Sequence, residues 1–240
     1  MIGASRGDYY SQAKEIGAIY VQDYNTLMDY NPDVVILCTS IMSLSKVLFK
    51  FPIERLESSL VVDVLSVKMY PRQLLLEKLS SQTDILCTHP MFGPESGKYS
   101  WKKLPFVYEK VRIQEKNQKR CERFLKVFEL EDCEMVNMTC SQHDSHAAST
   151  QFITHTTGRM LAALNVQSTP VNTLGYESLL EVVDTTCKDS FDLFYGLYRY
   201  NPHSRGQLDK LEESLKELRR RLRKKEEQEE EQAQTLETSK

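Results

Sequence analysis

The chain has 240 residues, of which 40% are hydrophobic and 27% charged, and its formal net charge at pH 7 is -3. This length and composition allow one good hydrophobic core, or two smaller ones. The slightly acidic balance lacks the basic field that binding to nucleic-acid phosphates needs, so nucleic acid is not an expected partner. No apolar run approaches the roughly 20 residues that cross a bilayer, so no membrane-spanning segment is expected.

Six cysteines are scattered along the chain without CxxC pairs or metal-ligand spacing. This distribution favours free thiols in a reducing compartment over a disulfide framework, and it predicts no metal site. The first residues, MIGASRGDYY, have neither the apolar core of a signal peptide nor the Arg- and Ser-rich character of a transit peptide. On these grounds alone the sequence indicates a soluble protein of the cytoplasm.

Over residues 1–140, short apolar runs alternate with amphipathic stretches, which is the rhythm of βαβ units around a parallel sheet. The runs at 34–38, 60–65 and 85–88 are continuously apolar, as expected for strands that helices cover on both faces. The sequence therefore predicts an α/β domain over residues 1–140.

Residues 141–205 show apolar positions at helical spacing and predict a smaller all-helical domain, which could supply a dimer interface. Its first helix is expected to begin with Ser141 as N-cap. Residues 206–240 predict a charged helical tail with a leucine stripe that could pack on the body or on a partner helix. After Leu222 the tail has a basic run followed by an acidic run, which favours a solvated helix end over a functional segment.

Two polar motifs follow strand-like runs of the α/β domain. The motif THPMFGPESG (88–97) comes directly after DILC, and DVLSVK (63–68) follows another apolar run. Ligands of open α/β sheets bind at the carboxyl ends of the strands. Both motifs are therefore expected at the edge of the sheet where a ligand would bind.

These two motifs, followed in order by HDSHAASTQFITHTTGR (143–159) and NTLGYE (172–177), closely resemble the plant-type arogenate/prephenate dehydrogenases. The resemblance runs from residue 1 to about residue 200 and implies a doubly wound, Rossmann-like parallel sheet followed by a helical domain. It also implies oxidative decarboxylation of arogenate to tyrosine with reduction of a nicotinamide cofactor, in a plastid and in a homodimer. The alternative enzyme is a prephenate dehydrogenase on the same scaffold.

His89 matches the catalytic histidine of this family, and Ser66 matches the serine that orients the histidine ring. A neutral imidazole suits the task of polarising the substrate's ring hydroxyl, and only one of its tautomers presents an acceptor to that hydroxyl. The alternative for His89 is a structural histidine at a strand end.

The resemblance also implies a set of substrate-binding residues. Gln151 and His155 are four residues apart and share one helix face, with a core-facing polar pair as the alternative. Thr173 matches a position in the family's pocket, and Lys68 brings an ammonium group to the edge where His89 lies.

Asp189 resembles the aspartate that arogenate-selective members carry and prephenate-preferring relatives replace. A carboxylate can pair with the side-chain ammonium of arogenate, whereas prephenate has a keto group there and gains nothing from it. The alternative is that Asp189 caps the helix that begins at SFDLF.

For the cofactor, Ser5 and Arg6 follow what resembles the second strand of a dinucleotide-binding domain, where NAD enzymes usually carry an acidic residue. An arginine there accommodates a 2′-phosphate, so NADP is expected, with Thr39 and Ser40 beneath the dinucleotide. The alternative for Arg6 is an exposed arginine near the chain start.

The main departure of the sequence from the family is that no glycine-rich GxGxxG-type turn occurs in it. The first strand of such a domain is central, so its absence is expected to leave neighbouring strands with unpaired edges. Cofactor affinity is expected to fall, since those glycines let the backbone approach the pyrophosphate. The rival interpretation is thus an inactive truncated paralogue that acts only as a dimerisation partner.

Overall fold

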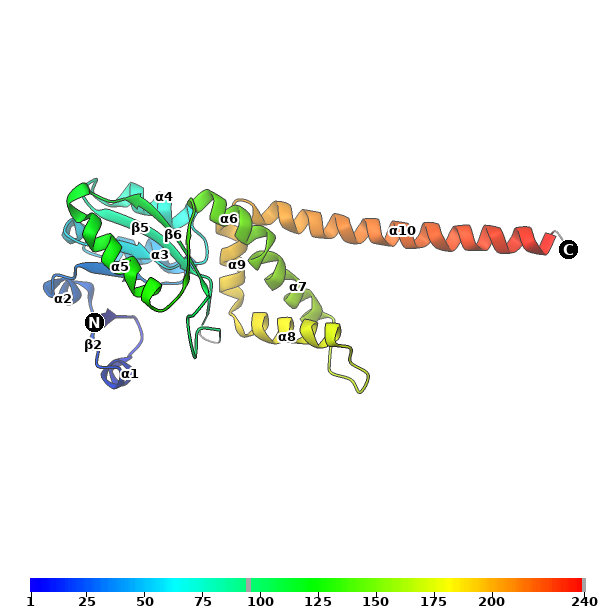
Figure 1. Ribbon diagram of the computed structural model, residues 1–240, viewed down its shortest axis with the longest axis horizontal. Coiled ribbons are helices and arrows are strands. Elements are labelled where there is room, and N and C mark those ends of the chain that lie inside the picture. The colour runs from blue at the N-terminus through cyan, green and yellow to red at the C-terminus, as the bar shows by residue number, and fades with distance from the viewer. Residues whose placement is uncertain (94–95, 239–240) are drawn as a thin grey trace. The chain divides into compact units, whose positions relative to one another are not determined.

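The computed structural model describes residues 1–93 and 96–238 (Figure 1). Pro94 and Glu95 of the THPMFGPESG motif, and the last two residues of the predicted tail, lie outside the described residues. The chain forms two compact units, Met1–Ala147 with Asp189–Asn201 and Ala148–Lys188 with Pro202–Lys240. No helix among the described residues combines the length and the apolar character needed to cross a membrane. The division at residues 140 and 205 stays a prediction.

The first unit is built around a sheet of five strands. Their order is β3 (Val34–Leu37), β4 (Leu60–Asp63), β5 (Asp84–Pro90), β6 (Pro105–Arg112) and β7 (Glu134–Asn137). All neighbours in this sheet are parallel except β5 and β6, which are antiparallel. The expected Rossmann-like, mainly parallel sheet with a helical C-terminal part is confirmed.

The sequence analysis did not mark strand β6. Only its first half is well buried, since Phe106 and Val107 are covered while Glu109 and Lys110 are more exposed. A strand covered over half its length shows neither a continuous apolar run nor a clean alternation. The pattern of residues therefore gave no clear strand signal.

The core of the first unit lies along the central strands. Every residue of β4 is buried, and Val61, Val62 and Leu86 have no exposed surface. On one face, Cys121 and Leu125 of the amphipathic helix α5 (Gln118–Leu130) form one buried apolar cluster with residues of β4 and β5. Burial on both faces explains why these strands read as continuous apolar runs.

The other helical segments of the first unit connect and cover the strands. They are η1 (Ile41–Ser43), α3 (Leu44–Lys50), η2 (Ile53–Leu56), α4 (Met69–Lys78), η3 (Glu115–Asn117), α6 (Cys140–Ser149) and α9 (Phe191–Tyr200). Helix α9 packs on η1 through Gly196, where a Cβ atom would lie 3.0 Å from Ile41 Cδ1. A late segment of the chain thus returns to the sheet-bearing unit.

The start of α6 differs from the prediction. Thr139 Oγ1 accepts a hydrogen bond from the Gln142 backbone N–H (3.2 Å), and Gln142 Oε1 accepts one from the Thr139 N–H (3.0 Å). This reciprocal pair is a capping box. Thr139 therefore caps the helix, and the assignment of Ser141 as N-cap was wrong.

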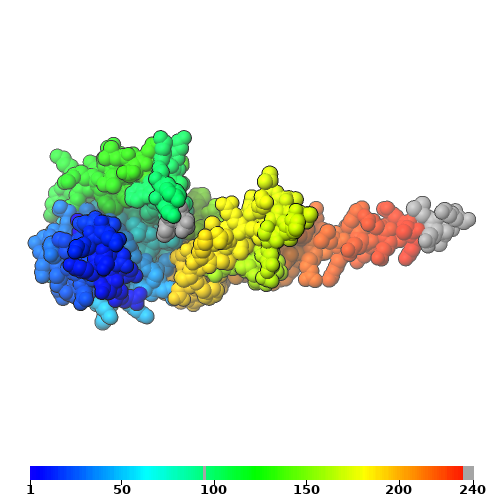
Figure 2. All heavy atoms as spheres, turned by 90° about the horizontal axis from the view of Figure 1, so that it is seen from below, coloured from blue at the N-terminus to red at the C-terminus, as the bar shows by residue number. Residues whose placement is uncertain are grey.

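The first residues form a separate two-stranded sheet. Strand β1 (Ile2–Ala4) pairs in parallel with β2 (Ile19–Val21), and the helices α1 (Tyr10–Glu15) and α2 (Tyr24–Asp29) follow them. Within the described part of the chain, β1 pairs only with β2 and β3 only with β4, and a largely apolar hollow of about 580 Å³ lies between β1 and β3. Figure 2 shows the start of the chain, in dark blue, on the surface of this unit. The expectation of unpaired strand edges is confirmed.

The second unit consists of helices. Helix α7 (Gln151–Ala163) packs against α8 (Leu174–Lys188) at Gly158, where a Cβ atom would collide with the Thr186 hydroxyl. Helix α10 (Ser204–Thr238) contacts α7 and then continues as a lone helix in both views (Figures 1 and 2). Its leucine stripe remains partly exposed, with Leu222 57% exposed.

Candidate active site

The two polar motifs meet at the carboxyl ends of β4 and β5. Parallel pairing sets Asp63, the last residue of β4, beside Cys87. The Thr88 hydroxyl donates a hydrogen bond to the Asp63 carbonyl (2.7 Å), which ties the two strand ends together. His89 follows on β5 and is only 5% exposed. The expected convergence of the two motifs at one sheet edge is present.

A chain of three buried side chains begins at His89. His89 Nδ1 lies 2.8 Å from His143 Nε2, and His143 Nδ1 lies 2.8 Å from Asp144 Oδ1. The carboxylate can only accept, so a neutral His143 carries its proton on Nδ1 and presents Nε2 as an acceptor. His89 must then donate from Nδ1. This fixes the tautomer of His89 with a free lone pair on Nε2, the form that can take a proton from a substrate.

Asp144 is held from several sides. Its carboxylate accepts hydrogen bonds from the backbone N–H groups of Lys68 (2.8 Å) and Met69 (2.9 Å), at the start of α4. The Asn201 side-chain amide donates to its carbonyl oxygen (2.8 Å). The carboxylate thus satisfies donors at a helix N-terminus while facing the positive end of the helix dipole. These contacts fix the Asp144 carboxylate, which in turn orients the His143 ring through their hydrogen bond.

Lys68 is buried beneath the same edge. Its ammonium donates to the Asp63 carboxylate and to the Thr88 carbonyl oxygen, and its exposed fraction is 2%. Burial raises the pKa of the Asp63 carboxyl, and the charge and hydrogen bond of Lys68 partly oppose that shift. The ammonium is therefore occupied inside the protein, and a direct role in substrate binding stays a prediction.

Two thiols lie in the same cluster. A hydrogen bond with the Cys140 thiol, together with burial and the nearby Asp63, raises the pKa of the Cys87 thiol well above its usual value. A thiol with a raised pKa is a poor nucleophile near neutral pH. Cys87 is therefore not a candidate nucleophile, and its buried side chain packs in the core.

The environment of His89 favours its neutral form. Burial is the main cause that holds its pKa well below the ordinary value, and electrostatic interactions with His143 and Lys68 act in the same direction. A proton acceptor must be unprotonated before the reaction begins. The surroundings of His89 therefore keep its ring unprotonated near neutral pH.

This lowered pKa has a consequence for stability. Between the ordinary pKa of about 6.5 and the lower folded value, unfolded His89 binds a proton that folded His89 does not. We expect the free energy of unfolding to fall as the pH drops below about 6.5, by at most about 1.4 kcal/mol per pH unit for this one group. Urea unfolding at several pH values between 7.5 and 5 measures it. The His89→Asn variant should show a shallower slope, and an unchanged slope would contradict the assignment.

The orienting partner predicted for His89 differs from the one the structure presents. No hydrogen bond joins the Ser66 side chain to another described residue, whereas His143 contacts the ring directly. The role of Ser66 stays a prediction. The signal for His143 and Asp144 was in the sequence, since both open the HDSHAASTQF motif, but they were given no role there.

The other predicted substrate residues are distributed over both units. Gln151 and His155 lie on α7 of the second unit, where Gln151 is half-buried and His155 is buried. Thr173 accepts a hydrogen bond from the Tyr176 N–H (3.2 Å) and so caps α8. Asp189 belongs to the first unit and precedes α9, whose N-cap is Ser190, with Oγ accepting from the Leu193 N–H. The alternative that Asp189 itself caps this helix was wrong.

The predicted cofactor residues lie in the first unit, after β1 and β3. The Thr39 hydroxyl is buried at the carboxyl end of β3 and has no hydrogen-bond partner among the described residues. A buried polar atom without a partner is uncommon, and one at this end of a parallel strand fits a polar ligand such as a dinucleotide. Ser40 donates to the Ser43 hydroxyl (2.8 Å) beside it.

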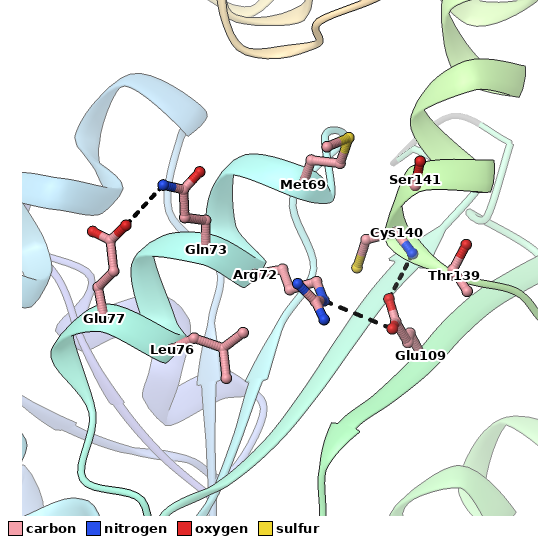
Figure 3. A pocket seen from close by; sticks show the side chains of 9 residues that line it. All are labelled: Met69, Arg72, Gln73, Leu76, Glu77, Glu109, Thr139, Cys140 and Ser141. Carbon is pink, nitrogen blue, oxygen red and sulfur yellow. Dashed lines mark hydrogen bonds and ion pairs between the residues drawn. The ribbon is translucent and has the colours of Figure 1, made fainter.

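A separate hollow of about 600 Å³ opens between α4, β6 and the start of α6 (Figure 3). None of the predicted site residues lines it. Its Arg72 guanidinium lies 3.7 Å from the Glu109 carboxylate, which also accepts a hydrogen bond from the Cys140 N–H. The opposite charges of Arg72 and Glu109 thus pair with each other at this hollow.

Comparisons with known proteins identify the family and the fold. Residues 1–134 match the family model described as prephenate dehydrogenase, nucleotide-binding domain, and residues 160–235 match the one described as TYRAAT1-like, C-terminal domain. The chain is 52% identical over 223 residues to arogenate dehydrogenase 2, chloroplastic, of Arabidopsis thaliana, covering 92% of this chain but only 62% of that protein.

Two solved structures share the fold. Prephenate dehydrogenase from A. aeolicus, in complex with hydroxyphenyl propionate and NAD+, superposes with a TM-score of 0.70 at 18% identity, covering 95% of this chain and 83% of that one. Synechocystis arogenate dehydrogenase gives a TM-score of 0.64 at 19% identity, covering 90% and 81%.

Proposed function

The chain belongs to the prephenate dehydrogenase family, and from that premise we propose that it catalyses the oxidative decarboxylation of arogenate to tyrosine with hydride transfer to NADP. The observation that carries the proposal is the chain of hydrogen bonds from Asp144 through His143, which leaves Nε2 of His89 as a proton acceptor. An oriented imidazole beside a ligand-binding sheet edge is the group that such chemistry requires.

In the proposed mechanism, Nε2 of His89 accepts the proton of the ring hydroxyl while the hydrogen on the same carbon leaves with its electron pair. A bound nicotinamide supplies the acceptor for that hydride. Loss of carbon dioxide leaves the electron pair of the broken bond in the ring, which becomes aromatic and regains a proton at oxygen. His143 and Asp144 hold the His89 ring and its tautomer throughout, as the third member of a triad does elsewhere.

The cofactor site we propose consists of Ser5, Arg6, Thr39 and Ser40. The unpartnered Thr39 hydroxyl supports it, and Arg6 stands where an NAD enzyme would carry an acidic residue. A guanidinium favours a 2′-phosphate, hence NADP rather than NAD. We place the reaction in a plastid, since the Arabidopsis relative is chloroplastic.

Substrate choice is proposed to depend on Asp189, with Gln151, His155 and Thr173 as further substrate-binding residues. The Asp189→Asn variant is expected to raise KM for arogenate roughly tenfold, because a charge-assisted hydrogen bond to the ammonium is lost, while KM for prephenate stays nearly constant. Initial rates of NADPH formation with each substrate measure this. Asp192→Asn, an exposed aspartate of α9, is the matched control. Equal changes on both substrates would contradict the assignment, and a higher kcat/KM on prephenate for the unaltered chain would establish the prephenate alternative.

A second candidate is an inactive partner of a longer relative. It is favoured by the hollow between β1 and β3 and by the exposed leucines of α10, which offer a surface for a second helix. No arogenate-dependent NADPH formation by the intact chain, together with heterodimers on size exclusion, would support it. Homodimers with activity would support the enzyme.

A further inference from the structure

A pocket of about 360 Å³ in the first unit carries an unbalanced positive charge. It lies between the segment after β1, the start of α2 and helix α3, and its cations are Arg6, Lys46 and Lys50. No carboxylate lines it, and within the described part of the chain none of these three cations forms an ion pair. A pocket with three cations and no acid is suited to a multiply charged anion.

The positions of these cations are set by the fold. The Tyr20 hydroxyl, from β2, donates to the Ser5 carbonyl (3.2 Å) and also to that of Gly7, which anchors the loop that carries Arg6. Lys46 and Lys50 are one helical turn apart on α3 and share a face. Like charges at this spacing repel each other unless an anion lies between them. Two elements distant in sequence thus direct positive charge at one hollow.

A hydroxyl completes the lining. Ser43 accepts a hydrogen bond from Ser40, so its own proton is available for a further acceptor. A guanidinium fork, two ammonium groups and a hydroxyl donor together match the three terminal oxygens of a phosphate monoester.

We propose that Lys46 and Lys50 join Arg6 in binding the 2′-phosphate of a 2′-phosphorylated adenine nucleotide. The inference rests on the proposed NADP-dependent function and extends it to two lysines of α3. Arg6 ends the strand-to-loop segment where the 2′ position of the ribose lies in dinucleotide-binding domains, which favours a nucleotide over free phosphate. The two lysines act as point charges that discriminate against an unphosphorylated ribose.

Calorimetry on the intact chain tests the inference with three probes: adenosine 2′,5′-bisphosphate, 5′-AMP and inorganic phosphate. We expect the bisphosphate to bind more tightly than the other two. Lys46→Gln and Lys50→Gln should each weaken bisphosphate binding roughly tenfold, since a dianion loses one partner in a partly screened site, and should leave 5′-AMP unchanged. Lys119→Gln, an exposed lysine of α5, is the matched control and should change nothing.

The possible outcomes separate the two proposals. The bisphosphate preference could be lost in Arg6→Gln but unchanged in Lys46→Gln and Lys50→Gln. That result would overturn this inference about the lysines, while the proposal of NADP as the cofactor would stand. No preference in the unaltered chain, or no nucleotide binding at all, would overturn both. Inorganic phosphate binding as tightly as the bisphosphate would show a general anion site and overturn the nucleotide assignment.

Discussion

Replacing His89 by asparagine is expected to lower kcat for arogenate by about 10²- to 10⁴-fold, the usual contribution of a positioned acid-base group. Asparagine is smaller than histidine, but its amide can still donate a hydrogen bond to His143, and its side chain has no basic nitrogen. Binding of adenosine 2′,5′-bisphosphate should stay unchanged, because the residues proposed to bind it lie after β1 and on α3. Stopped assays of NADPH formation and calorimetry measure the two quantities on the same preparation.

The matched control is His146→Asn, an exposed histidine of α6, the helix that also carries His143. It should retain kcat within about twofold, since surface substitutions away from a site have small effects. If His89→Asn kept most of the activity, or if both variants lost it equally, His89 would not be the proton acceptor. The buried chain to Asp144 would then be a structural network only.

The second large effect concerns Lys68. The Lys68→Met variant is expected to lower the free energy of unfolding by about 3–5 kcal/mol, because it leaves the buried Asp63 carboxylate without its partner. Burial already raises the pKa of Asp63, so part of the loss is relieved if this carboxyl becomes protonated. Urea unfolding at pH 7 measures the change.

A double variant and a surface control make the test specific. Adding Asp63→Asn to Lys68→Met should recover much of the loss, because the buried charge is then removed as well. Lys78→Met, on the exposed end of α4, should change the stability by less than about 0.5 kcal/mol. A stable Lys68→Met protein with a raised KM for arogenate would instead favour the substrate-binding prediction for Lys68.

Much of the fold could be predicted because the central strands are covered on both faces. The fully buried β4 gives a continuous apolar run, as expected for a strand that helices cover on both faces. Strand β6 escaped prediction since its second half is partly exposed and its pairing with β5 is antiparallel. The N-cap of α6 was also assigned to the wrong residue. Several polar residues lie close together there, so the sequence alone did not show that Thr139, in a capping box with Gln142, precedes the helix.

The candidate site likewise has one part that follows a local sequence signal and another part that depends on long-range contacts. His89 stood out because its motif follows a strong strand signal, so its place at the sheet edge could be read from the chain. The partners His143 and Asp144 come from α6, more than fifty residues later, and their contact depends on how that helix meets the start of α4. Such long-range hydrogen bonds leave no periodic pattern in a sequence. The same holds for Arg6 and Lys46, which share a pocket without sharing a motif.

The unpaired sides of β1 and β3 bear on how this chain behaves at high concentration. Each presents a row of backbone N–H and C=O groups beside apolar side chains, and Ile36 on β3 is 46% exposed. Such an edge accepts an extended segment from any source, including another molecule of the same chain. Intermolecular strand addition is second order in protein, whereas folding is first order. The yield of monodisperse material should therefore fall as the protein concentration during synthesis or refolding rises, even when the stability of the folded chain is unchanged.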